Sequence, residues 1–266
     1  MLLATPVGWL VIVYLGSLAI LFANAFFTRD AFSGATIYQP TLDNFARLLE
    51  EPYPGITLRT AGMAIAVTLT CAVLAVPIAF FMARVVPARW RSALVVAVIV
   101  PLWASYLIKV YAWRLILAEE GILNELLRPF GLSGPGFGEV AVWLVFTYLW
   151  LPYMILPVYA GLERIPESVL EASADLGGHA LVTFRRIVLP LALPAIVAGS
   201  IFTFSLTLGD YIAPAQVSTT IFIGNAIYSN FGAGNLPLAA ALSLVPLAIV
   251  IAYLVIARRF GAFEAL

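Results

Sequence analysis

Three charged side chains interrupt apolar runs that are long enough to cross a membrane. Lys109 and Arg114 fall within residues 92–117, and Asp210 lies near the far end of residues 191–214. A bare charge is costly in hydrocarbon, so each of these side chains should face a cavity or a partner charge. Charges in such places can bind a charged solute in transit or relay an ion.

Aromatic residues accompany these charges. Tyr106 and Trp113 share a helical face with Lys109, and Tyr211 directly follows Asp210. Aromatic rings beside an acid suit the passage of a cation, because the face of the ring attracts positive charge. The candidate translocation pathway therefore consists of Asp210, Lys109, Tyr106, Trp113 and Tyr211.

A structural interpretation of the same charges competes with the pathway. In it, Asp210 pairs with Lys109 or Arg114 and ties the third apolar span to the fifth. A third interpretation is a secondary transporter in which Asp210, Lys109 and Arg114 relay an ion down its gradient. Six spans, no visible inverted repeat and so few intramembrane charges argue against that transporter.

The sequence offers few residues for nucleotide binding, metal binding or catalysis. The only lysine, Lys109, follows Ile108, whereas a phosphate-binding P-loop needs a Gly-Lys pair before Ser or Thr. Cys71 is the only cysteine and His179 the only histidine, so neither a disulfide nor a cysteine or histidine metal site is expected. We expect no catalytic residue, no metal and no cofactor in this chain.

A polar insert, residues 163–189, separates two apolar runs. Its first half predicts a short helix with Pro166 in the first turn, ended by Gly177 or Gly178. Ala172, Ser173 and Ala174 have little bulk, so another protein could approach this helix closely. A helix of this kind is typical of segments that dock into a groove on a partner, whereas connections between neighbouring helices are usually much shorter.

The second half of the insert predicts another short helix, over Ala180–Ile187. Arg185 and Arg186 lie toward its carboxyl end, where cations are favoured. Pro190 is expected to break this helix at the membrane surface.

The elements that position these residues are six membrane-spanning helices. The chain is 63% hydrophobic and 11% charged over 266 residues, with a mean hydropathy of +1.03, which excludes an ordinary soluble domain. Runs of about 20 apolar residues are long enough to span a bilayer. We expect a single all-α integral membrane domain over residues 1–266, with spans at residues 6–27, 60–83, 92–117, 140–162, 191–214 and 236–257.

Charge distribution predicts the orientation of these spans. With the first span starting inside, the inner segments hold eight arginines and the outer loops only four. The excess of basic residues inside places both termini in the cytoplasm. The outer loops also hold eight acids, which would suit a cationic solute. The first span is longer than a signal peptide needs and is expected to be retained.

The insert resembles a known family. Glu171-Ala172-Ser173, then Gly177, Ile187 and Leu189-Pro190 follow the spacing of the EAA signature of bacterial ABC importer membrane subunits, with Ser173 in place of the second alanine. The runs "PLWASYLIKVYAWRLIL", "GILNELL" and "TFSLTLGDYIAP" resemble the first permease subunit of spermidine/putrescine importers and of relatives for iron(III), thiamine, opines and aminophosphonates.

This resemblance implies a type I ABC importer permease fold in the bacterial inner membrane, with a cytoplasmic coupling helix between helices 4 and 5. It also implies that the EAA residues of the insert dock on a dimer of ATPase subunits that binds ATP and Mg²⁺. The other implied partners are a second permease subunit, which the resemblance favours as a sister chain, and a periplasmic solute-binding protein. No nucleic-acid partner is expected. A membrane scaffold without a solute would fit the helices but not the EAA signature.

Overall fold

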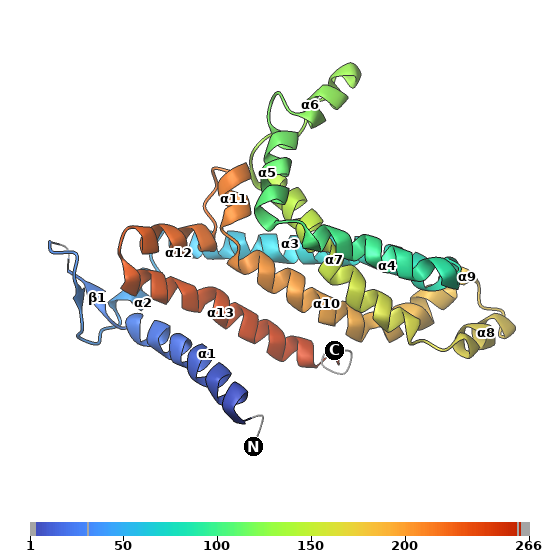
Figure 1. Ribbon diagram of the computed structural model, residues 1–266, viewed down its shortest axis with the longest axis horizontal. Helices are drawn as coiled ribbons and strands as arrows, with labels where there is room; N and C mark the ends of the chain where they lie inside the picture. Colours follow the sequence, from blue (N-terminus) through green and yellow to red (C-terminus); the bar gives the residue numbers. More distant parts are fainter. Residues whose placement is uncertain (1–3, 31, 260, 262–266) are drawn as a thin grey trace.

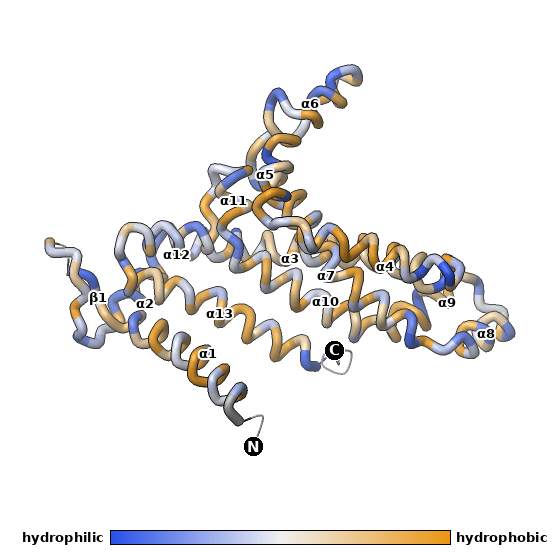
Figure 2. Tube along the Cα trace, in the orientation of Figure 1, coloured by the Kyte–Doolittle hydropathy of each residue, from blue (hydrophilic) through white to orange (hydrophobic). Residues whose placement is uncertain are grey.

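The computed structural model describes residues 4–30, 32–259 and 261. It is elongated, with polar segments at its two ends and apolar helices between them (Figures 1 and 2). One end carries a short hairpin of β1 (Thr28–Arg29) and β2 (Thr36–Ile37), together with α2 (Asp43–Arg47). The other end carries α8 (Glu167–Asp175) and α9 (Ala180–Thr183).

Long apolar helices confirm the all-α membrane fold. Among the described residues, five helical segments are long and apolar enough to cross a membrane, and there is a sixth span if one bent pair of helices is counted as a single span. The long helices are α1 (Ala4–Asn24), α3 (Tyr53–Phe80), α7 (Glu139–Glu163), α10 (Leu189–Gly209) and α13 (Leu236–Arg258). The shorter elements α11 (Ile212–Val217) and α12 (Ile223–Gly232) connect the last two.

The third expected span differs from a straight helix. Residues 92–117 are divided between α4 (Ala88–Trp103) and α5 (Tyr106–Leu117), and the two parts of this span meet at 88°. Ala104 and Ser105 are extended at the break. Pro101 weakens the last turn of α4 because it has no N–H and its ring crowds the preceding turn. Beyond α5 the chain forms α6 (Ile122–Leu127) and a 3₁₀ turn, η2 (Arg128–Phe130), which project from the body (Figure 1).

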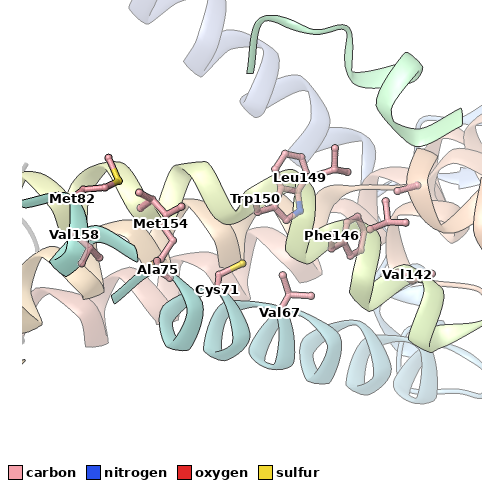
Figure 3. Close-up of a cluster of buried hydrophobic side chains, with 14 of the residues drawn as sticks. Val67, Cys71, Ala75, Met82, Val142, Phe146, Leu149, Trp150, Met154 and Val158 are labelled. Carbon is pink, nitrogen blue, oxygen red and sulfur yellow. The ribbon is translucent and has the colours of Figure 1, made fainter. Parts of the chain in front are cut away.

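The core lies between α3, α7 and α10. Small side chains such as Cys71 and Ala75 on α3 face larger ones such as Phe146 and Met154 on α7, and all four are fully buried (Figure 3). Gly161 on α7 lies so close to Ala195 on α10 that a Cβ atom would overlap the Ala195 side chain. Small residues let membrane helices approach closely and gain van der Waals contact.

Two helices continue through π-helical turns at the end of the molecule that carries the insert. α3 runs into η1 (Phe81–Val85), and α9 runs through η3 (Phe184–Val188) directly into α10. The expectation that Pro190 ends the second helix of the insert is therefore wrong. Leu189 donates its N–H to Phe184 five residues earlier, and Pro190, which needs no hydrogen-bond acceptor, lies in the first turn of α10.

Candidate coupling insert and intramembrane polar site

The insert helix α8 ends in a tight glycine turn. Gly177 has a φ of +77°, a left-handed conformation that side chains disfavour. Its N–H donates to the carbonyl of Ala174 at 2.9 Å, and the N–H of Gly178 donates to the carbonyl of Ser173 at 2.8 Å. These two bonds form a Schellman motif, which satisfies the last carbonyls of α8 and reverses the chain toward α9.

The buried side chain of Ser173 stabilises this reversal of the chain. Its side chain is buried, and its hydroxyl lies 2.7 Å from that of Thr183 on α9. A Cβ atom on Gly178 would lie 2.6 Å from the Ser173 Oγ and 2.7 Å from the Ser173 carbonyl oxygen. Ser173 was expected only to let another protein approach α8 closely, whereas its buried side chain packs α8 against α9 and Gly178.

The outward face of the insert is free to contact another protein. Glu171, Ala172 and Asp175 are exposed on α8. Leu176 is 90% exposed and Leu181, at the start of α9, is 68% exposed. Exposed leucines beside acids and small residues suit a protein contact better than free solvent.

The remaining residues of the EAA pattern lie where the insert returns to the helices. Ile187 in η3 and Leu189 in α10 are half-buried, and Pro190 is exposed. Val188 between them belongs to the main buried cluster. The structure thus places Ile187, Leu189 and Pro190 at the base of the insert, whereas Glu171 and Ala172 lie on its exposed face.

Removing the Ser173 hydroxyl is expected to have a small effect. Ser173→Ala loses one hydrogen bond, worth about 1 kcal/mol, and keeps the turn intact. ATP-driven uptake by the assembled transporter should therefore change less than about threefold. Ser173→Leu is the matched contrast, because the larger side chain has no room beside Gly178. Equal uptake by the two variants would contradict a buried role for Ser173.

Asp210 occupies the break between α10 and α11. One carboxylate oxygen accepts the backbone N–H groups of Ile212 at 2.8 Å and Ala213 at 3.1 Å, which caps the start of α11. The other carboxylate oxygen accepts the hydroxyl of Tyr106 on α5. Gly224 packs against the same break, since a Cβ atom there would lie 2.8 Å from the Asp210 carbonyl oxygen.

The charges on α5 bind other groups. Lys109 donates to the carbonyl of Pro101 at 3.2 Å, in the last turn of α4, where a cation complements the helix dipole. Arg114 donates to Gln216 on α11 at 2.6 Å. Asp210 forms no ion pair with either residue in the part of the chain that the structure describes. The expected tie between the third and fifth spans exists, but Tyr106 makes it in place of a cation.

The other aromatic candidates lie against neighbouring helices. Trp113 packs on Tyr148 of α7 with ring centroids 5.5 Å apart, and Tyr106 stacks on Trp150 at 6.2 Å. Tyr211 stacks on Tyr228 of α12 at 4.4 Å. Of the five pathway candidates, Asp210 and Tyr106 are the pair joined by a side-chain hydrogen bond among the described residues. Their contacts within the chain hold α5, α7 and the α11–α12 segment in place.

Several residues of this arrangement carry no signal in the sequence. Thr183 and Gly224 lie outside any spacing that suggests a contact, and the sequence identifies Arg84 only as a positive charge at the inner surface. In the structure Arg84 donates to the carbonyls of Leu162 and Ile165 at 2.5 Å each. Only the folded chain brings these partners together.

Fold and insert together define a class of protein: a membrane-spanning transport subunit with a rigid helical insert exposed at one end. Residues 75–262 match the family of binding-protein-dependent transport system inner membrane components. The chain belongs to this family, and it is a permease subunit of a binding-protein-dependent ABC importer.

Sequence relatives agree with this assignment. The inner membrane ABC transporter permease protein YdcU of Escherichia coli strain K12 is 46% identical over 100% of this chain and 90% of its own length. The spermidine/putrescine transport system permease protein PotB of Salmonella typhimurium strain SL1344 is 36% identical, over 86% of this chain and 81% of its own length.

Solved structures agree on the fold. A bacterial alginate ABC transporter, in complex with its alginate-bound periplasmic protein, has a chain that matches with a TM-score of 0.75 at 16% identity. The match covers 100% of this chain and 93% of that one. The MetNI methionine ABC transporter in an inward-facing form matches with a TM-score of 0.59 at 18% identity, over 82% of this chain and 99% of that one.

Proposed function

We propose that this chain forms half of the translocation pathway of a polyamine importer and couples it to ATP hydrolysis in a separate subunit. The observation that carries the proposal is the insert. A Schellman turn and the Ser173–Thr183 contact fix the shape of α8 and leave Glu171, Ala172 and Leu176 exposed for a partner. ATP and Mg²⁺ bind to the ATPase partner and not to this chain.

Polyamines are the favoured solutes because PotB proteins are 36% identical over most of this chain. The negative outer loops support a cationic solute as well, since they would attract it toward the pathway. The other subunits of the importer would be two ATPase subunits, a sister permease chain and a periplasmic binding protein. The direct solute contact of Asp210, Lys109, Tyr106, Trp113 and Tyr211 stays a prediction.

Uptake into proteoliposomes tests this function. The permease pair should be reconstituted with the ATPase subunit of the same operon, and labelled spermidine and putrescine offered with the binding protein. We expect accumulation that needs ATP and stops when the ATPase subunit is left out. Accumulation driven by an ion gradient alone would favour the secondary transporter with Asp210, Lys109 and Arg114 as its relay. No accumulation of any solute, with the ATPase absent from the purified complex, would favour a scaffold.

Labelling with an impermeant maleimide tests the proposed orientation, in which both termini are cytoplasmic. Ala180 begins α9 of the insert and Glu50 lies between α2 and α3, and both are exposed. In a background with Cys71→Ala, which removes the buried cysteine, Glu50→Cys should label from outside intact cells. Ala180→Cys should label only after the cells are permeabilised. Labelling of both positions from outside would overturn the orientation.

A further inference from the structure

The inner end of α3 lies where both flanks of the insert return to the core. α7 leads into α8, and α9 with η3 leads from α8 back to α10. The residues from Phe80 to Val85, which close α3 and form η1, contact both flanks. Residues 80–85 therefore connect the helical core to the segments on both sides of α8.

Arg84 makes the contact with the leading flank. Its guanidinium donates to the carbonyls of Leu162 and Ile165, both at 2.5 Å. The Leu162 carbonyl lies in the last turn of α7, which ends at Glu163, and the Ile165 carbonyl lies just beyond it, near the carboxyl end of the helix, where a cation is favoured. Ile165 is buried, and Pro166 and α8 follow it at once. A displacement of the amino end of α8 would therefore move the carbonyls to which the Arg84 guanidinium is hydrogen-bonded.

Phe80 makes the contact with the trailing flank. Its ring meets that of Phe184 edge to face, with centroids 5.5 Å apart and planes at 86°. Phe184 begins η3 and directly follows Thr183, which contacts Ser173 on α8. Both phenylalanines pack on the main buried cluster. A displacement of the carboxyl end of α8 therefore reaches α3 through an aromatic contact.

The amino end of α3 contacts the outer segment, which comprises residues 218–222 between α11 and α12 and the start of α12. Arg59 forms an ion pair with Glu139 at 3.1 Å and donates to the carbonyl of Ile221 at 3.2 Å. Thr60 accepts the backbone N–H of Ile223 at 3.0 Å. Together with η1, α3 is one helical segment of 33 residues, or about 50 Å at 1.5 Å per residue. It thus links the insert to the opposite end of the molecule.

We propose that Arg84 and the Phe80–Phe184 pair are positioning residues that transmit movement of α8 to α3, which carries it to the outer segment around Ile221. The π-helical turns η1 and η3 provide the wide, less regular backbone at the two contacts. This inference rests on the proposed function, because it assumes that an ATPase subunit moves α8.

Nucleotide-dependent labelling of the outer segment tests the transmission without reference to the solute. Ile221 is 52% exposed, so Ile221→Cys in the Cys71→Ala background should react with an impermeant maleimide. In the purified full complex, a non-hydrolysable ATP analogue should change the labelling rate. Arg84→Gln should reduce that change by about threefold or more while ATPase subunits still copurify, as expected for loss of two hydrogen bonds from a cation.

Arg89→Gln is the matched control. Arg89 lies five residues further along the chain, is exposed, and makes no side-chain hydrogen bond among the described residues. It should keep the full nucleotide response, and Arg84→Lys should restore part of it. A wild-type response in Arg84→Gln would overturn the proposal. So would the absence of any response in the unmodified complex when the ATPase copurifies, whereas failure of the ATPase to copurify would instead overturn the proposed function.

A second variant covers the case in which Arg84→Gln does not assemble. Phe184→Leu keeps an apolar side chain of similar volume and removes the edge-to-face contact, so the fold should survive. Its nucleotide response should fall, and Phe80→Leu combined with it should lower the response no further, since both changes remove one contact. A full response in Phe184→Leu, or additive losses in the pair, would overturn the proposal.

Discussion

ATP-driven uptake should fall at least about tenfold when Gly178 is replaced by valine, because the turn that shapes the insert has no space for a side chain. A Cβ atom there would lie 2.7 Å from a backbone carbonyl oxygen, that of Ser173, which cannot move without opening the Schellman turn. Overpacking of this kind costs about 1–3 kcal/mol or more, and a factor of ten corresponds to about 1.4 kcal/mol. Uptake per assembled complex, measured in proteoliposomes, checks the result.

Gly177→Asn is the control for Gly178→Val. Gly177 has a φ of +77° but open space around its missing side chain, so its replacement costs only backbone strain. Asparagine tolerates the left-handed region better than most residues, and the variant should keep most of its uptake. If Gly177→Asn proved as damaging as Gly178→Val, the close approach of Gly178 to Ser173 would not be what the insert requires.

Asp210→Ala should lower the amount of assembled permease several-fold. The substitution removes three hydrogen bonds to a carboxylate, two that cap α11 and one from Tyr106 on α5. Hydrogen bonds to charged groups contribute about 1.5–3 kcal/mol each, and losses of 1–2 kcal/mol already change abundance several-fold. The measurement is the yield and melting temperature of the complex in detergent.

Asp210→Asn and changes on α5 separate the structural role from the pathway. Asparagine keeps the oxygen that caps α11, so Asp210→Asn should be milder than Asp210→Ala. No change at Lys109 or Arg114 should rescue Asp210→Ala, because those side chains bind Pro101 and Gln216. Normal yield of Asp210→Ala with lost uptake would show that Asp210 acts on the solute and not on the fold.

Much of the architecture was predictable from local composition. Apolar runs of about 20 residues have one stable arrangement in a bilayer, the helix, so the span at residues 140–162 corresponds to α7. The helix of the insert was predictable for a similar reason. Pro166 was expected in the first turn and Gly177 or Gly178 after the last; in the structure Pro166 immediately precedes α8 and Gly177 follows its last turn.

The break in the third span was not predictable from hydropathy, because the residues on both sides of it are apolar. Pro101 marks a weak point, yet prolines also lie inside α7 and α13, which remain single helices. What decides the bend is the set of contacts that hold α5 against α11. Tyr106 and Arg114 make those contacts with residues more than 100 positions away.

The sequence by itself determined that this protein has long apolar spans interrupted by a polar helical insert, and its EAA spacing already resembled that of ABC importer membrane subunits. The tertiary structure decided which partner each polar group has. Ser173 faces Thr183 and not another protein, and Asp210 binds Tyr106 and not Lys109. Arg84 binds the carbonyls of Leu162 in α7 and of Ile165 just after it. Wherever lipid or packing excludes water, a polar group takes the partner that packing brings within reach, and packing depends on all the helices at once.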